Sequence, residues 1–262
     1  MFLISSMGRG VVAWLADVRH TVAVAAAVVW VAVQPRYWPR TVRNVLARQI
    51  LFTGYQATRF VSTVALLVGI SVVVQAQVWT AALGQSSLLG PVLVMVIIRE
   101  VGPLLTNFIV IARSGTAMAT ELASMRVMGE TQVLDAQGVD PFIYLVLPRA
   151  VGAAVSVFCL SVIFVFVSFI GGFLSGVLLG ANTGGPWLFI DSVFGAIRPA
   201  DVVNLLAKTL IPGLLMGTIC CIQGLGIRGV ATEVPQAATR AVVKSIMAMF
   251  VTSALVSLLT YL

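Results

Sequence analysis

Two adjacent charged residues, Arg99 and Glu100, lie inside an otherwise apolar stretch of the chain, residues 88–116. If this stretch crosses a bilayer, each charge costs at least about 2.5 kcal/mol, so such residues are kept for a purpose. Neighbouring residues on a helix point in different directions, so each side chain must find a partner on another helix, in a lipid head group or in water. Lys208, in a later apolar stretch, is a candidate partner for Glu100.

Further polar residues follow the charged pair at helical spacing. At 3.6 residues per turn they form two neighbouring stripes on one helix. The first stripe is Arg99, Thr106 and Arg113, and the second is Glu100, Asn107 and Ser114. Two functions fit such stripes: an interhelical ion pair that holds the bundle together, or the lining of a wet cavity or substrate path. Both interpretations stay open at the level of the residues.

Other kinds of chemistry lack the residues that they require. His20 is the single histidine, which excludes a zinc site built on paired histidines. Cys159, Cys220 and Cys221 all lie in apolar stretches, as small packing residues do. The sequence contains no Walker-type phosphate loop and no Gly-x-Ser-x-Gly turn. We therefore expect no catalytic residue, no metal and no cofactor in this chain.

The composition places the chain in a membrane. Hydrophobic residues make up 60% of the 262 residues and charged residues only 10%, too few to cover a soluble surface. The mean hydropathy is +1.06. A net charge of +7 would also suit nucleic acid, but the basic residues lie in short segments between apolar runs. That distribution fits the positive-inside bias of membrane proteins, so we expect no nucleic-acid partner.

Five apolar runs are each long enough, at about 20 residues, to cross the hydrocarbon core as a helix. They cover residues 60–83, 88–116, 146–180, 202–227 and 241–261, with turn-forming residues at 84–87 and 182–186. The sequence therefore predicts an all-α polytopic membrane protein with residues 51–262 as its transmembrane domain. Small-xxx-small spacing, interpreted as helix packing within the chain, occurs at Gly172, Gly176 and Gly180 and at Gly213 and Gly217.

Lysine and arginine are distributed unevenly between the two sides of these spans. Thirteen lie before the first span, in the second and fourth connections or at the span ends that adjoin those connections, against one, Arg198, in the connections on the other side. The positive-inside rule then places the N-terminus and the charged loops in the cytoplasm. With five spans, Leu262 lies outside, which for a bacterial inner membrane is the periplasm.

The first fifty residues form a separate region. The apolar run Thr21–Val33 is short for a span, and it is followed by Trp38 and an arginine cluster rather than by a signal-peptide cleavage site. Since tryptophan and arginine anchor at head-group depth, residues 1–50 are predicted to hold an amphipathic helix in the inner-leaflet interface. An extra short span is the alternative.

Residues 119–139, on the cytoplasmic side between the second and third spans, mix apolar and charged positions as a docked surface helix does. The apolar positions are Leu122, Met125, Val133 and Leu134, and the polar ones are Glu121, Arg126, Glu130 and Asp135. We expect one short helix along the membrane surface here. A solvated connector is the alternative interpretation.

Several motifs in this order resemble the MlaE-type permease family, the membrane subunit of ABC lipid transporters that work with MCE proteins. They are Arg99-Glu100-Val101-Gly102-Pro103, Glu121 with Met125-Arg126, Gly138 with Asp140-Pro141, and Pro148-Arg149. The resemblance covers about residues 45–262. It departs at Gly129 and Gln132. Members of the family usually carry an acidic residue at each of these two positions, so detailed contacts with an ATPase are expected to differ there.

The resemblance implies a homodimeric permease that moves phospholipid or a related lipid between the bacterial inner membrane and the envelope beyond. Cytoplasmic ATPase subunits, which bind the ATP, and a periplasmic MCE-domain protein would be its partners. It assigns the lipid path to Arg99, Glu100, Thr106 and Asn107, and ATPase coupling to Glu121, Met125, Arg126, Glu130 and Asp140. Two other functions fit less well. A membrane-embedded lipid-modifying enzyme would need a nucleophile or metal cluster, and a passive scaffold would not need the coupling segment.

Overall fold

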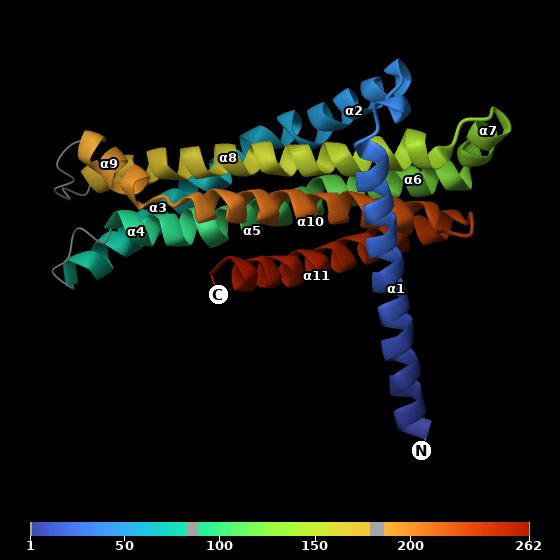
Figure 1. Cartoon of the computed structure of the whole chain (residues 1–262), viewed down its shortest axis with the longest axis horizontal. Coiled ribbons are helices and arrows are strands. Elements are labelled where there is room, and N and C mark those ends of the chain that lie inside the picture. Colours follow the sequence, from blue (N-terminus) through green and yellow to red (C-terminus); the bar gives the residue numbers. More distant parts are fainter. Residues whose placement is uncertain (1, 83–88, 179–185, 262) are drawn as a thin grey trace.

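The structure is a computed structural model that describes residues 2–82, 89–178 and 186–261. The turns predicted at residues 84–87 and 182–185, and Gly180, lie outside the described residues. Every regular element within these ranges is helical. The long helices other than the N-terminal one run along one axis of an elongated bundle (Figure 1).

The bounds of the helices are as follows. They are α1 Phe2–Ala32, α2 Arg40–Thr53, α3 Thr58–Ala82, α4 Leu89–Leu93, α5 Gly102–Val110, α6 Thr116–Val127, α7 Glu130–Ala136, α8 Leu147–Leu178, α9 Pro186–Ala196, α10 Pro199–Leu225 and α11 Val234–Tyr261. Two π-helical segments, Val94–Val101 and Ile111–Gly115, join α4, α5 and α6 into one continuous helix. A third, Phe142–Val146, leads into α8.

Six helical stretches of the described residues are long and apolar enough to cross a membrane. They are Leu15–Ala32, Arg40–Thr80, Gly90–Val127, Phe142–Leu178, Pro199–Leu225 and Ala231–Thr260. Each of the last five overlaps one of the five predicted spans. The prediction of an all-α, multi-pass membrane protein is therefore confirmed.

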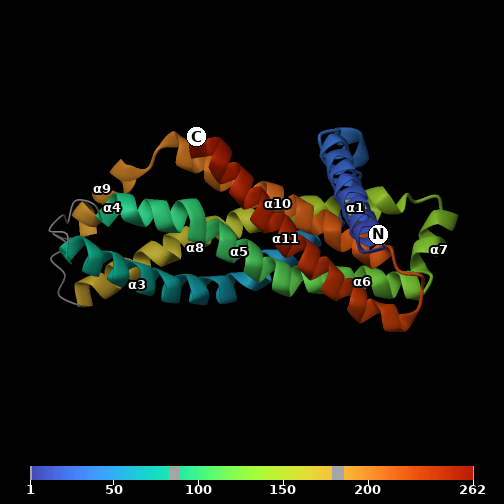
Figure 2. The ribbon, with the colours of Figure 1, turned by 90° about the horizontal axis from the view of Figure 1, so that it is seen from below.

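The first of these stretches belongs to α1, which is longer than the predicted apolar run. Helix α1 crosses the bundle instead of following its axis, and Figure 2 shows it nearly end-on. Its buried residues, Ala25 and Val28, lie toward its C-terminal end, where it meets α8 and α10. If the bundle axis follows the membrane normal, this orientation places α1 in the plane of the membrane. Its place in the inner-leaflet interface stays a prediction.

Helix α8 lies at the centre of the bundle and packs on α2, α3, α5 and α10. Glycines permit the closest contacts: Gly172 of α8 lies against Val73 of α3, and Gly213 and Gly217 of α10 lie against α8. A Cβ atom added at Gly217 would come within 2.6 Å of the Ala150 Cα atom. At these three positions the small-residue spacing serves packing within the chain, as predicted.

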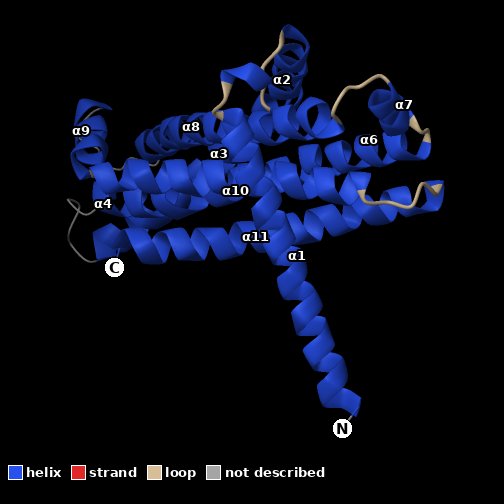
Figure 3. Ribbon diagram, turned by 45° about the vertical axis from the view of Figure 1, so that its right-hand side comes forward, coloured by secondary structure: helices blue, strands red, loops and turns tan. Residues whose placement is uncertain are grey.

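Helix α9 was not predicted, because its first residue, Pro186, was assigned to a turn. Proline is well suited to the first position of a helix, where its missing N–H would have no partner anyway. Helix α9 is turned across the end of the bundle (Figure 3) and packs on α4. It buries Phe189 and Val193.

Candidate functional site

The first predicted polar stripe makes contacts with two different neighbouring helices. The Arg99 side chain reaches Asp201 of α10, whereas the Arg113 guanidinium donates to the Phe52 carbonyl of α2, 3.2 Å away. Arg99 and Arg113, predicted to share one stripe, thus bind different helices. The two π-helical segments, where i→i+5 bonding adds a residue to the turn, also depart from the regular 3.6-residue period on which the stripe was based.

Two interhelical ion pairs hold the charged residues of this helix to α10. The Arg99 Nε atom lies 2.8 Å from Asp201 Oδ1, and Lys208 Nζ lies 2.7 Å from Glu100 Oε1. The Ser257 hydroxyl of α11 donates to the same Glu100 oxygen over 3.0 Å. The predicted partnership of Glu100 with Lys208 is confirmed, and each pair is formally neutral, as charges in a low-dielectric site require.

The two members of each pair differ in exposure. The α10 side chains are buried, with 1% of Lys208 and none of Asp201 exposed. By contrast, 22% of the Arg99 side chain and 45% of the Glu100 side chain are exposed. One cation and one anion, consecutive in the chain, are thus partly exposed, while their counter-charges on α10 are buried.

Two prolines explain why polar side chains cross between these helices. Pro103 has no N–H to give to the carbonyl four residues earlier, Arg99. That carbonyl instead accepts from Lys208 Nζ over 2.9 Å and from Asn204 Nδ2 over 3.1 Å. The pattern is reciprocal, because the second proline frees a carbonyl of α10.

Pro212 likewise leaves the Lys208 carbonyl without its helical donor. The Asn107 amide, which also donates to the Pro103 carbonyl over 2.8 Å, donates to the Lys208 carbonyl over 3.0 Å. Buried polar groups are thereby satisfied in a setting where an unpaired one is costly. Asn107 therefore lies among the residues that join α5 to α10, and Thr106 beside it is buried.

Sequence reasoning missed Asp201 and Asn204. With Lys208 they lie at positions i, i+3 and i+7 of α10, so they share one helix face. That spacing of polar residues in an apolar span is the pattern that could have found them.

The segment predicted as one helix along the membrane surface, residues 119–139, is instead broken. Helix α6 continues the long membrane helix to Val127, and α7 starts at Glu130 after a turn at Gly129, whose φ is +76°. This left-handed conformation is one that glycine adopts readily. The break therefore falls at one of the two positions where the chain departs from the family pattern.

The residues assigned to ATPase coupling lie around this turn. Glu121 and Met125 are on α6, with Glu121 Oε1 2.7 Å from Arg149 Nη2, whose side chain is only 7% exposed. Arg126 Nη1 donates to the Thr131 hydroxyl of α7 over 3.3 Å. Exposed Glu130 begins α7. Asp140, also exposed, accepts from a backbone amide at the start of the next helical segment. Glu121 thus has a structural partner as well as an exposed carboxylate.

Comparison with known proteins identifies the family. The model of the permease MlaE family matches residues 46–259. A probable ABC transporter permease protein of Rickettsia prowazekii is 28% identical over 91% of this chain and 94% of its own length. A probable ABC transporter permease protein of Synechocystis is 33% identical over 68% of this chain and 67% of its own length. The chloroplastic protein trigalactosyldiacylglycerol 1 of Arabidopsis thaliana is 32% identical over 80% of this chain and 59% of its own length.

The chain belongs to the MlaE permease family. Its matched region includes α3 to α11 and leaves out α1 and the start of α2. As an ABC transporter permease, an MlaE-family chain is the membrane-spanning component, and the family implies an ATPase partner. The ion pairs Arg99–Asp201 and Glu100–Lys208 lie within the matched region, as does the broken segment around Gly129.

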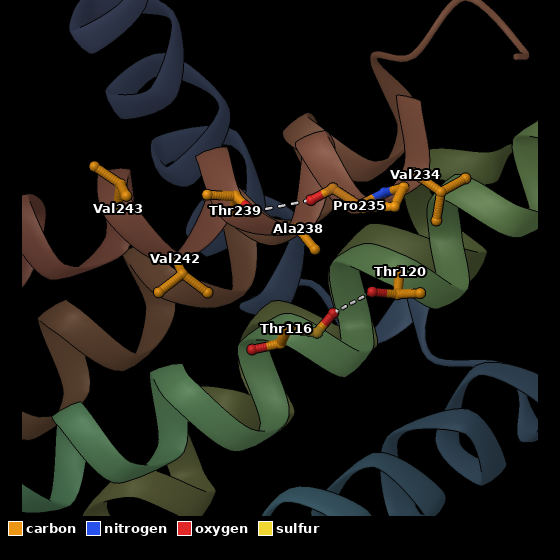
Figure 4. Close-up of a pocket in the computed structure, with 8 residues that line it drawn as sticks. All are labelled: Thr116, Thr120, Val234, Pro235, Ala238, Thr239, Val242 and Val243. Atoms are coloured by element: carbon orange, nitrogen blue, oxygen red, sulfur yellow. Dashed lines mark hydrogen bonds between the residues drawn. The ribbon is translucent and has the colours of Figure 1, made fainter. Parts of the chain in front are cut away.

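This MlaE-family permease also has a groove between α6 and α11, of about 490 Å³. Figure 4 shows the residues that line it. The hydroxyls of Thr116, Thr120 and Thr239 each donate to a carbonyl one turn earlier on their own helix. Their methyl groups and the neighbouring valines therefore leave a largely apolar groove, suited to packing against another helix.

Proposed function

We propose that this chain is the permease subunit of an ABC transporter that moves phospholipid, or a related lipid, between the bacterial inner membrane and the periplasm. The observation that carries the proposal is that Arg99 and Glu100 are partly exposed while their partners, Asp201 and Lys208, are buried. A partly exposed cation and a partly exposed anion at consecutive positions complement the phosphate and amine of a zwitterionic head group. The printed name of the Arabidopsis relative, which contains that of a galactolipid, also favours a lipid substrate.

The energy would come from cytoplasmic ATPase subunits bound at the α6–α7 end. Glu130 and Asp140 are exposed there, and Arg126 links α6 to α7. The Gly129 turn and the Arg126 bond fix α7 relative to the long helix, so a displacement of α7 by a partner would be transmitted to the helix that carries Arg99 and Glu100. By the positive-inside rule this end faces the cytoplasm.

Two copies of the permease would form the transporter, with a periplasmic MCE-domain protein receiving or supplying lipid at the other end. The α6–α11 groove is a surface that suits the second copy. It is lined by small and β-branched side chains, which let helices approach closely in a membrane.

The test is purification of the tagged permease from its own cells. An ATPase subunit is expected to co-purify, and its ATP hydrolysis is expected to rise when phospholipid is added. Permease that binds no ATPase, or a complex whose hydrolysis ignores phospholipid but responds to a water-soluble solute, would contradict the proposal.

A further inference from the structure

A second apolar cavity lies between α8 and α9, on the opposite end of the bundle from α7 (Figure 1). Its volume is about 360 Å³, and every residue described as lining it is apolar. Five phenylalanines contribute to its wall: Phe166, Phe169, Phe173, Phe189 and Phe194. None of the residues assigned to the lipid path lines it.

The cavity has a buried floor. Ile98, Phe189 and Val193 are among the least exposed residues of their segments. The rings of Phe173 and Phe189 lie 5.4 Å apart, in a tilted arrangement that joins α8 to α9. The floor is therefore built from packed side chains rather than from a loose surface.

The mouth of the cavity is formed by two matched pairs of large side chains. Phe166 and Ile170 on α8, and Ile190 and Phe194 on α9, are each four residues apart, so each pair lies on one helix face. All four are exposed. Because α9 packs on α4, its other face is left to form a wall opposite α8.

We propose that this cavity binds one hydrocarbon chain of a membrane phospholipid, at a site separate from the Arg99 and Glu100 pair. Residues 165–173 lie in the membrane-spanning part of α8, so lipid chains are the medium at its mouth. Ordered water is not a suitable occupant, because it would need two to four polar partners. An empty cavity would deprive its walls of dispersion contacts.

The size and the flanking charges narrow the choice of ligand. The volume is at the low end of the range for ligand pockets, about 300–1,000 Å³, which suits one chain better than a whole diacyl lipid. Asp191 and Arg198, both exposed, bring charges of both signs to the α9 side. These charges suit a zwitterionic phospholipid better than the single carboxylate of a free fatty acid.

A bound hydrocarbon chain would also stabilise the position of Asp201, the ion-pair partner of Arg99. Ile197 lines the cavity, and the backbone N–H of the next residue, Arg198, donates to Asp201 Oδ2 over 2.9 Å. Asp201 in turn pairs with Arg99. Three successive contacts thus link a chain bound in the cavity to the ion pair between Asp201 and Arg99.

The experiment uses a phospholipid with a photoactivatable diazirine midway along one acyl chain. The purified permease, with the partners that co-purify, is reconstituted in nanodiscs with this lipid, without ATP, and adducts are located by mass spectrometry. Adducts on peptides with Phe169 and Phe173 are expected, and those on the exposed α11 residues Leu255 and Leu259 serve as the internal standard for bulk lipid. Since ATP is absent, failure of transport would leave this result intact.

A filling substitution tests the site itself. Val193→Trp places an indole in the cavity and is expected to lower the cavity adducts about tenfold relative to the α11 adducts, because the chain loses its space. Val203→Trp, at an exposed α10 position outside the cavity, is the matched control and should leave both unchanged. If Val193→Trp fails to assemble, Ile190→Trp at the mouth gives the same comparison.

Three results would overturn the proposal. One is cavity adducts that neither filling variant lowers, and another is labelling of bulk-facing residues alone. The third is occupation by something else: a photocrosslinking residue at Phe166 that captures a partner polypeptide, or a diazirine fatty acid that labels the cavity while the phospholipid does not.

Discussion

Removing the carboxylate of Glu100 is expected to destabilise the permease far more than removing the ammonium of Lys208, its partner. Glu100→Ala leaves Lys208 Nζ in a site that is 1% exposed, with the neutral Arg99 carbonyl as the acceptor that the structure still offers. Lys208→Met leaves Glu100, which is 45% exposed and still bonded to Ser257. If Glu100 lines the proposed lipid path, water that enters this path can solvate its carboxylate, whereas the buried Lys208 ammonium stays out of reach of water.

The difference in exposure sets the magnitudes. Stranding a buried charge costs about 3–5 kcal/mol, which in a chain of this size lowers the unfolding midpoint by about 10 °C. Lys208→Met should cost about 1 kcal/mol, since a solvated partner gains little from its pair. The double variant Glu100→Ala/Lys208→Met removes both charges and should recover most of the loss caused by Glu100→Ala.

The assay is thermal unfolding of the purified permease in one detergent, followed by the fluorescence of its five tryptophans. The four proteins form a double-mutant cycle. Additive losses in the double variant, or a larger loss from Lys208→Met than from Glu100→Ala, would refute the argument from exposure.

Three other changes have expected outcomes. Asn107→Leu leaves the Lys208 carbonyl without its amide donor and should cost about 1–3 kcal/mol; an unchanged midpoint would show that the bond contributes nothing. Glu130→Lys, on exposed α7, should keep the midpoint but lower phospholipid-stimulated ATP hydrolysis about fivefold, an effect of about 1 kcal/mol at a charged interface; full hydrolysis would remove this residue from coupling. In a cysteine-free version, Trp187→Cys should react with an impermeant thiol reagent from outside and Gln137→Cys should not, and the reverse labelling would exclude the proposed orientation.

Some contacts of the site could be predicted from the sequence and others could not. Glu100 and Lys208 could be paired in advance, because a lone lysine in an apolar span needs an anion and few were available. Asp201 escaped notice because an acid at the start of a helix is ordinary there. It accepts the Arg198 N–H at the helix start, but it also binds Arg99.

The backbone explains the remaining differences. The five spans follow from long apolar runs, which the fold confirms. Pro103 removes the helical donor of the Arg99 carbonyl, and π-helical segments contain both Arg99 and Arg113. A regular 3.6-residue period could not anticipate these segments. The broken segment at Gly129 could have been foreseen, since glycine favours the left-handed turn found there.

ATP-driven phospholipid movement is the measurement that tests the central claim most directly. The permease, reconstituted with its ATPase and MCE-domain partners in liposomes, should transfer a fluorescent phospholipid to or from an acceptor only while ATP is hydrolysed. The assembled Glu100→Ala/Lys208→Met variant should lose most of this transfer. Phospholipid-stimulated hydrolysis without any ATP-dependent transfer by the wild-type complex would contradict the account.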